Sequence, residues 1–119
     1  MSHLKDMMPK NWVLIQAEKE SIFSNELNRE LIIGHVLFAK KAVAIARKDG
    51  EDDVLFYLEG QDDQYAEVHL TWNNETNPRW PSTSLFRSLE DWKKTNEDDF
   101  YNLMPFEKSG LKLIRIKYI

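Results

Sequence analysis

Hydrophobic and polar positions alternate most regularly between Tyr65 and Trp72. The apolar positions are Ala66, Val68, Leu70 and Trp72. The polar positions between them are Tyr65, Glu67, His69 and Thr71. A period of two places these sets on opposite faces of an extended strand. Slipping the register by one residue would bury Glu67 and His69, so the pattern fixes the register. It predicts a half-buried strand over 65–72, with Trp72 in the core.

Two further strands are predicted directly before this one. Residues 42–48 alternate small side chains with Val43 and Ile45, and residues 54–59 form a nearly continuous apolar run. The Asp49-Gly50 pair between them is a strong hairpin signal, and a second turn follows over 60–64. The three strands are therefore expected to form an antiparallel meander with the strand from Val54 at its centre.

A first helix is predicted over 18–32. Phe23, Leu27 and Leu31 recur every four residues, with Ile22 beside them. The polar residues between them are expected to face outward, and these are Glu26, Asn28, Arg29 and Glu30. Gly34 stands where a C-terminal glycine stop belongs.

A second helix is predicted to begin after Ser88, because Ser88-Leu89-Glu90-Asp91 has the form of a capping box. Its buried stripe would comprise Leu89, Trp92, Phe100 and Leu103, and Pro105 would end it. The alternative is a break at Thr95-Asn96, which would divide the segment in two. The alternation in residues 111–119 predicts a fourth strand, whose charged outer face suits a sheet edge.

The remaining segments have weaker patterns. Residues 1–10 show no period and are expected to be a flexible terminus, and 12–15 suits either a strand or the opening turn of a helix. Residues 73–81 are rich in turn formers and predict a loop. The whole chain, 1–119, is thus expected to be a single α+β domain, an antiparallel meander sheet of three to four strands packed with two main helices.

Composition narrows the class of protein. The 119 residues include 16 basic and 20 acidic side chains, a net charge of -4, which disfavours nucleic acid as the main partner. Cysteine is absent, which excludes disulfides and thiol chemistry. No stretch approaches the roughly 20 apolar residues of a membrane span, so we expect a cytoplasmic monomer or small homo-oligomer without membrane contact.

His69 is the main candidate for catalysis. A histidine beside a carboxylate such as Glu67 can act as a general base, which would make the protein a small hydrolase-type enzyme. The competing interpretation is a half-exposed strand histidine bonded to a neighbour, favoured because no nucleophile motif is present. The histidine spacing and the single glycines predict no metal site and no cofactor.

The loop between Trp72 and Trp80 is the main candidate for binding. Tryptophan and arginine are enriched in binding hot spots, which points to Trp80, Arg79 and Glu75, together with His69 and Thr71 on the polar strand face. The alternative is that the tryptophans fold back into the core, with Trp72 the more surely buried.

Three pieces in order carry a resemblance: Asp52-Asp53-Val54-Leu55-Phe56, Val68-His69-Leu70-Thr71-Trp72, and Trp80-Pro81 with Trp92 beyond. Over about the middle half of the chain they look like small, functionally uncharacterised bacterial proteins. In size and acidity the chain also resembles immunity proteins that neutralise toxins. The resemblance implies a compact bacterial α+β domain.

The leading hypothesis from the sequence is a non-catalytic protein-binding or regulatory module. It follows from the missing catalytic motifs, the tryptophan-bearing loop and the acidic turns, which would steer a basic partner.

Overall fold

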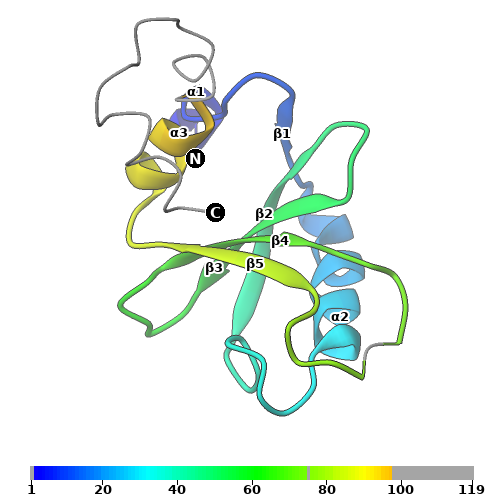
Figure 1. Cartoon of the computed structure of the whole chain (residues 1–119). Coiled ribbons are helices and arrows are strands. Elements are labelled where there is room, and N and C mark those ends of the chain that lie inside the picture. Colours follow the sequence, from blue (N-terminus) through cyan, green and yellow to red (C-terminus); the bar gives the residue numbers. More distant parts are fainter. Residues whose placement is uncertain (1, 75, 98–119) are drawn as a thin grey trace, which may run out of the picture.

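The computed structural model describes residues 2–74 and 76–97 (Figure 1). Four expectations lie outside these residues: the binding role of Glu75, the buried positions of Phe100 and Leu103, the helix end at Pro105, and the strand over 111–119. Within the described part, no helix is long and apolar enough to cross a bilayer.

The sheet has five antiparallel strands in the order β1-β2-β3-β4-β5. They are β1 (Trp12–Leu14), β2 (Ala42–Lys48), β3 (Asp53–Leu58), β4 (Tyr65–His69) and β5 (Ser82–Phe86). The α+β class and the central meander are confirmed, with β3 in the middle. The expected count of three to four strands is too low, because residues 12–14 pair with β2 and residues 82–86 pair with β4. β5 was not predicted, because its serines and threonine are typical of loops. It lies at the edge of the described sheet, where polar side chains are tolerated.

The helices are α1 (Ser2–Asp6), α2 (Glu20–Glu30), which follows the 3-10 turn η1 (Ala17–Lys19), and α3 (Leu89–Glu97). The Asp91 backbone N–H donates to Ser88 Oγ at 3.1 Å, so the predicted cap of α3 is present. The short run at 12–15, left open between strand and helix, contributes β1, because Trp12, Val13 and Leu14 pair with β2.

Both faces of the sheet are covered, as the positions of α2 and α3 show (Figure 1). One apolar cluster lies between α2 and the sheet and includes Leu27, Phe56, Val68 and Leu70. The second lies on the other face, where Trp92 of α3 packs on Trp12 and Leu55. The face of β4 that was predicted to be polar and open is therefore partly covered by α3.

Candidate functional site

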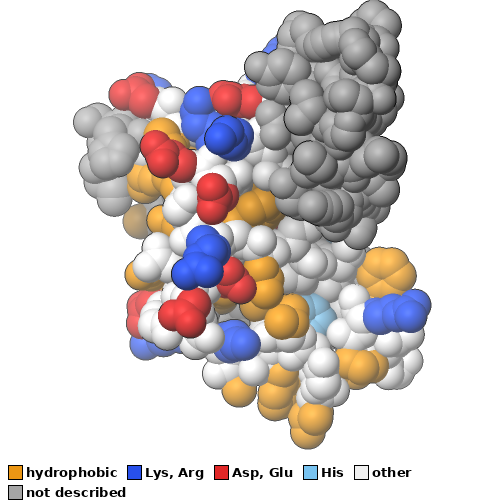
Figure 2. All heavy atoms as spheres, turned by 60° about the vertical axis from the view of Figure 1, so that its left-hand side comes forward, with side chains coloured by type: hydrophobic (Ala, Val, Ile, Leu, Met, Phe, Trp, Pro, Cys, Tyr) orange, Lys and Arg blue, Asp and Glu red, His pale blue; other side chains and the backbone are white. Residues whose placement is uncertain are grey.

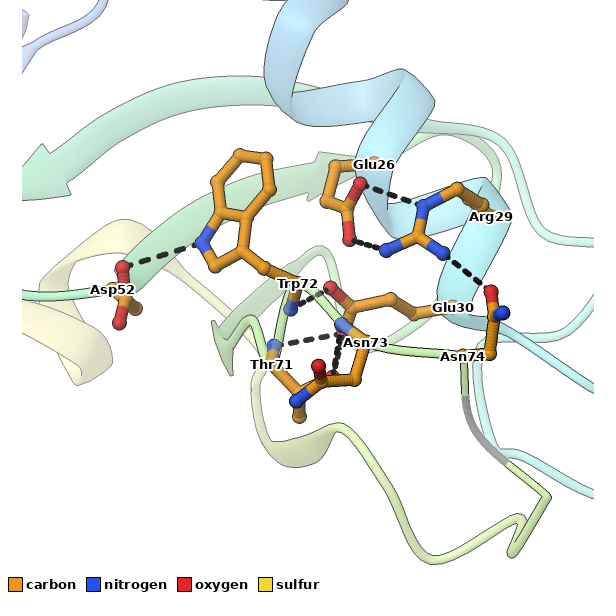
Figure 3. Close-up of polar contacts among 8 residues, drawn as sticks. All are labelled: Glu26, Arg29, Glu30, Asp52, Thr71, Trp72, Asn73 and Asn74. Carbon is orange, nitrogen blue, oxygen red and sulfur yellow. Dashed lines mark hydrogen bonds and ion pairs between the residues drawn. The ribbon is translucent and has the colours of Figure 1, made fainter.

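Glu30, in the last turn of α2, is completely buried and binds the start of the β4–β5 loop, residues 70–81 (Figure 3). Its Oε1 accepts hydrogen bonds from the Thr71 N–H at 2.9 Å and from the Thr71 hydroxyl at 3.1 Å. Its Oε2 accepts from the Trp72 N–H at 2.6 Å. The prediction that Glu30 faces outward is wrong. It lies seven residues after Phe23 and three after Leu27, which places it on the buried side of the helix.

Glu26, one turn before Glu30, is also buried rather than outward-facing. Its two oxygens accept a forked pair of hydrogen bonds from Arg29, Nε at 2.9 Å and Nη2 at 2.5 Å. Arg29 Nη1 donates to Asn74 Oδ1 at 2.6 Å, a second link from α2 to the loop. The Arg29 guanidinium thus satisfies the Glu26 carboxylate and fixes the loop at the same time.

The two carboxyl groups differ in their affinity for a proton. Arg29 lowers the pKa of Glu26, whereas burial and the neighbouring Glu26 carboxyl raise the pKa of Glu30 against the opposing pull of the Thr71 and Trp72 amides. Both carboxyl groups accept hydrogen bonds from other residues of the protein, so this cluster holds the β4–β5 loop against α2.

Trp72 lies at the surface, with 44% of its area exposed. The prediction that it is buried with Leu70 is wrong, because β4 ends at His69 and the alternation does not continue beyond Leu70. Glu30 accepts hydrogen bonds from the backbone N–H groups of Thr71 and Trp72. Trp72 also adopts a left-handed φ of 59°, which turns the chain away from the strand direction. Its indole Nε1 donates to Asp52 Oδ1 at 3.2 Å, which lays the ring against the β2–β3 turn.

His35 joins the β4–β5 loop to the α2–β2 loop, residues 31–41. The Leu37 N–H donates to His35 Nδ1 at 2.9 Å, so the ring proton is assigned to Nε2, which donates to the Pro81 carbonyl at 2.8 Å. The Thr83 hydroxyl donates to the same carbonyl at 3.0 Å. Gly34 lies so close to Pro78 that an added Cβ would come within 3.1 Å of the proline side chain. The two loops therefore pack directly on each other.

Several large apolar side chains next to this contact face solvent, and we call them the loop surface. They are Ile33, Val36 and Phe38 of the α2–β2 loop, Trp80 of the β4–β5 loop and Leu85 of β5. Figure 2 shows hydrophobic side chains gathered at this lower end of the molecule, where the α2–β2 loop lies in Figure 1. Ile33 is the extreme case, with 79% of its area exposed.

A hollow of about 150 Å³ lies on the loop surface. Val36 and Leu85 form apolar parts of its wall, while Asp62 and Asp63 of the β3–β4 turn add two carboxylates and Lys40 one ammonium group. Lys40 Nζ donates to the Val36 carbonyl at 2.9 Å. The acidic turn predicted to steer a partner therefore borders the exposed apolar residues.

The structure separates the residues predicted to bind. Trp80 and Arg79 are both exposed in the β4–β5 loop, and Trp80 belongs to the loop surface. Thr71 lies inside the Glu30 contact, bonded through both its N–H and its hydroxyl. His69 lies two residues after Glu67 on β4, and therefore on the face of the sheet where Glu67 contacts Trp92 of α3.

His69 and Glu67, the candidate catalytic pair, have different partners. His69 Nδ1 lies 2.6 Å from Asp53 Oδ1, and this carboxylate raises the pKa of the exposed histidine. Ser82 lies opposite His69 on β5, so Asp53, His69 and Ser82 form one row across three strands. Neither His69 nor Glu67 lines the hollow beside Val36 and Leu85.

Glu67 lies beneath α3, where Trp92 Nε1 donates to its Oε1 at 2.9 Å. Burial raises the pKa of this carboxyl, and the tryptophan hydrogen bond only partly opposes the shift. Glu67 is thus a packing residue whose charged form is disfavoured by its surroundings.

The variant Glu67→Gln is expected to be more stable than the wild type at pH 8 and to lose this advantage near pH 4. A raised folded-state pKa means that Glu67 stabilises the fold below its unfolded pKa and that this contribution is lost as the pH rises through the folded pKa. Glutamine keeps an acceptor for Trp92 without the charge. Thermal unfolding from pH 4 to 8 measures the difference, and equal wild-type and variant profiles would refute the assignment.

Among residues 2–74 and 76–97, no group of three or more histidine or acidic side chains is arranged to hold a metal ion.

The functional candidates that sequence reasoning missed are His35, Ile33, Val36 and Phe38. They lie in a loop without a hydrophobic period, so no sequence pattern indicated them. The burial of Glu30, by contrast, could have been predicted from its spacing to Phe23 and Leu27.

Comparison with protein-family models, with curated proteins and with solved structures found no match.

Proposed function

We propose that this protein is a non-catalytic protein-binding module and that the loop surface is its binding site. The observation that carries the proposal is that two buried polar side chains, Glu30 and His35, hold two loops whose apolar side chains face solvent. Exposed apolar groups on ordered loops bordered by polar residues are typical of interaction sites.

The composition of the loop surface favours a protein as partner. Phe38 and Trp80 are large aromatic side chains of the kind that anchor protein interfaces. Because the loops are fastened by buried hydrogen bonds, little conformational entropy remains to be lost on association. The hollow beside Val36 and Leu85 suits a single apolar side chain of the partner rather than a whole small molecule.

Charge indicates a partner with basic residues near its apolar anchors. Asp62 and Asp63 border the hollow, and the chain carries a net charge of -4, which would speed association with a positively charged surface. A regulatory role of the immunity-protein kind, in which a small acidic protein covers a basic target, agrees with these features.

The test is capture of a partner from a lysate of the source organism with three immobilised proteins. The wild type is compared with Phe38→Ser/Trp80→Ser and with the control Val13→Ser/Ile22→Ser. The control also replaces two exposed apolar residues, at 41% and 53% exposure, but in β1 and α2. We expect a partner whose affinity falls at least about tenfold in the loop variant and stays unchanged in the control, since hot-spot residues contribute about 2 kcal/mol or more.

Thermal unfolding of each variant shows that the fold is retained before binding is compared. Equal recovery of a partner by the wild type and both variants would place the binding site elsewhere. Recovery of no partner in repeated experiments would contradict the proposed function itself.

A further inference from the structure

We propose that a groove along β1, remote from the loop surface, binds an extended protein segment that carries acidic and apolar side chains. The groove has a volume of about 500 Å³ and lies where the chain passes from β1 through η1 into α2 (Figure 1). We call it the β1 groove, and its wall comprises Val13, Leu14, Ile15, Gln16, Lys19, Ile22, Phe23 and Arg47. None of these residues belongs to the loop surface, so the inference stands independently of the proposed function.

The wall of the β1 groove is largely apolar, and it is anchored in the core. Val13, Leu14 and Ile22 are exposed, whereas Ile15 and Phe23 pack against the apolar cluster beneath α2. Exposed apolar side chains gathered around a groove are typical of a binding surface. Because two of the five apolar residues belong to the packed interior, the groove has its shape before a segment binds.

The backbone of β1 offers a second recognition element. β1 is the outermost strand of the described sheet, so only one of its two edges pairs with β2. The Ile15 N–H donates to the Ile45 carbonyl at 2.8 Å and thus faces β2. Backbone groups alternate in direction along a strand, so the Leu14 N–H and carbonyl face away from β2, at the outer edge. The Trp12 N–H also faces away, since it donates to the Pro9 carbonyl at 3.1 Å.

Charge indicates which side chains the segment carries. Lys19 and Arg47 line the β1 groove, and its described wall contains no carboxylate, although the chain has a net charge of -4. Glu20, the neighbour of Lys19, accepts from the Ala44 N–H at 2.9 Å through its Oε2. Asp49 lies 3.9 Å from Arg47 at the surface, a weak pair. The two cations favour carboxylates beside the apolar anchors of the segment and would repel the same groove of a second copy.

These features together fit strand addition. In this mode of recognition, an outer strand edge supplies main-chain hydrogen bonds, and an adjoining groove takes alternate side chains of the added segment. The volume of the β1 groove admits several side chains. A small amphiphilic acid would use the groove and the cations but not the strand edge, so a protein segment accounts for more of the structure.

The experiment uses the extended peptide Glu-Thr-Val-Thr-Val-Thr-Glu-Thr, whose one face carries two valines between two glutamates. Its basic counterpart has lysine in place of both glutamates, and each is titrated into the ¹⁵N-labelled full chain. We expect a saturable shift of the Leu14 amide with the acidic peptide and binding of the basic peptide that is at least about tenfold weaker.

Two N-methylated versions of the acidic peptide test the backbone pairing. Each is methylated at one of the two alternating sets of amides, and only one set can face β1. One version should therefore lose binding while the other retains it. Decanoate, an apolar carboxylate without a peptide backbone, is titrated in parallel.

A charge exchange in the protein tests the role of the two cations. Lys19→Glu/Arg47→Glu should prefer the basic peptide to the acidic one. The matched control, Arg87→Glu/Lys94→Glu, reverses one lysine and one arginine that are exposed outside the groove and should retain the wild-type preference.

The two apolar double variants of the capture experiment exchange roles here. Val13→Ser/Ile22→Ser should bind the acidic peptide about tenfold more weakly or worse, whereas Phe38→Ser/Trp80→Ser should bind it as the wild type does. Failure of this proposal is therefore distinguishable from failure of the proposed function.

No saturable shift with the acidic peptide, equal binding of the acidic and basic peptides, or equal binding of both N-methylated versions would overturn the proposal. Binding of decanoate without binding of the acidic peptide would assign the groove to small amphiphilic acids and would equally overturn it.

Discussion

Replacing Glu30 by alanine is expected to lower the free energy of unfolding by about 3–5 kcal/mol. The substitution removes the acceptor of three partly buried hydrogen bonds, two from backbone amides and one from the Thr71 hydroxyl. Urea unfolding at neutral pH, followed by tryptophan fluorescence and circular dichroism, measures the loss.

Two further variants separate the contact from general effects of charge removal. Glu30→Gln retains the side-chain volume and one acceptor, so we expect a smaller loss than in Glu30→Ala. Glu18→Ala removes an exposed carboxylate from the turn before α2 and should change stability by less than about 0.5 kcal/mol. A Glu30→Ala protein as stable as Glu18→Ala would refute the role assigned to Glu30.

Trp92→Ala is expected to cost about 3–5 kcal/mol, whereas Trp72→Ala should cost about 1 kcal/mol or less. Trp92 is completely buried, packs on Trp12 and donates to Glu67, so its removal opens a cavity under α3. Trp72 is half-exposed and its ring packs at the surface, beside Asp52. The same denaturant experiment compares the two variants directly.

This comparison distinguishes the structure from the simple strand pattern. Extending the alternation of β4 through residue 72 places Trp72 in the core, so a large loss in Trp72→Ala would favour that arrangement. Losses of equal size in the two variants would likewise contradict the structure.

The central meander could be predicted because its information is local. Residues 42–48 and 65–69 alternate with a period of two, and Asp49-Gly50 marks the hairpin between β2 and β3. β5 was missed because Ser82, Thr83 and Ser84 resemble loop residues when considered alone. They form a strand because β4 offers them a free edge, which is a property of the fold rather than of the segment.

Glu26 and Glu30 were predicted to be exposed because they are charged, but both are buried. The spacing from Phe23 and Leu27 places both glutamates on the buried side of α2, but an acidic side chain is normally assigned to the surface. Their partners, Arg29 beside them and the amides of Thr71 and Trp72 far along the chain, make the burial possible. The amides could not be foreseen from the helix sequence.

Of the residues of the loop surface, only Trp80 could be predicted from the sequence. Trp80 and Arg79 stood out by residue type, whereas Ile33, Val36 and Phe38 belong to a segment with no period. Their exposure depends on where His35 fixes the loop, and a lone histidine between two elements gave no indication of that contact.

Amide hydrogen exchange in the wild-type protein tests most directly whether Glu30 and His35 hold the two loops of the loop surface in place. We expect the Leu37, Thr71 and Trp72 amides, which donate to His35 and Glu30, to exchange as slowly as the amides of β4. The Val36 amide, which has no acceptor among the described residues, should exchange much faster. Exchange of all four amides at the rate of an unstructured peptide would show that Glu30 and His35 do not fix these loops.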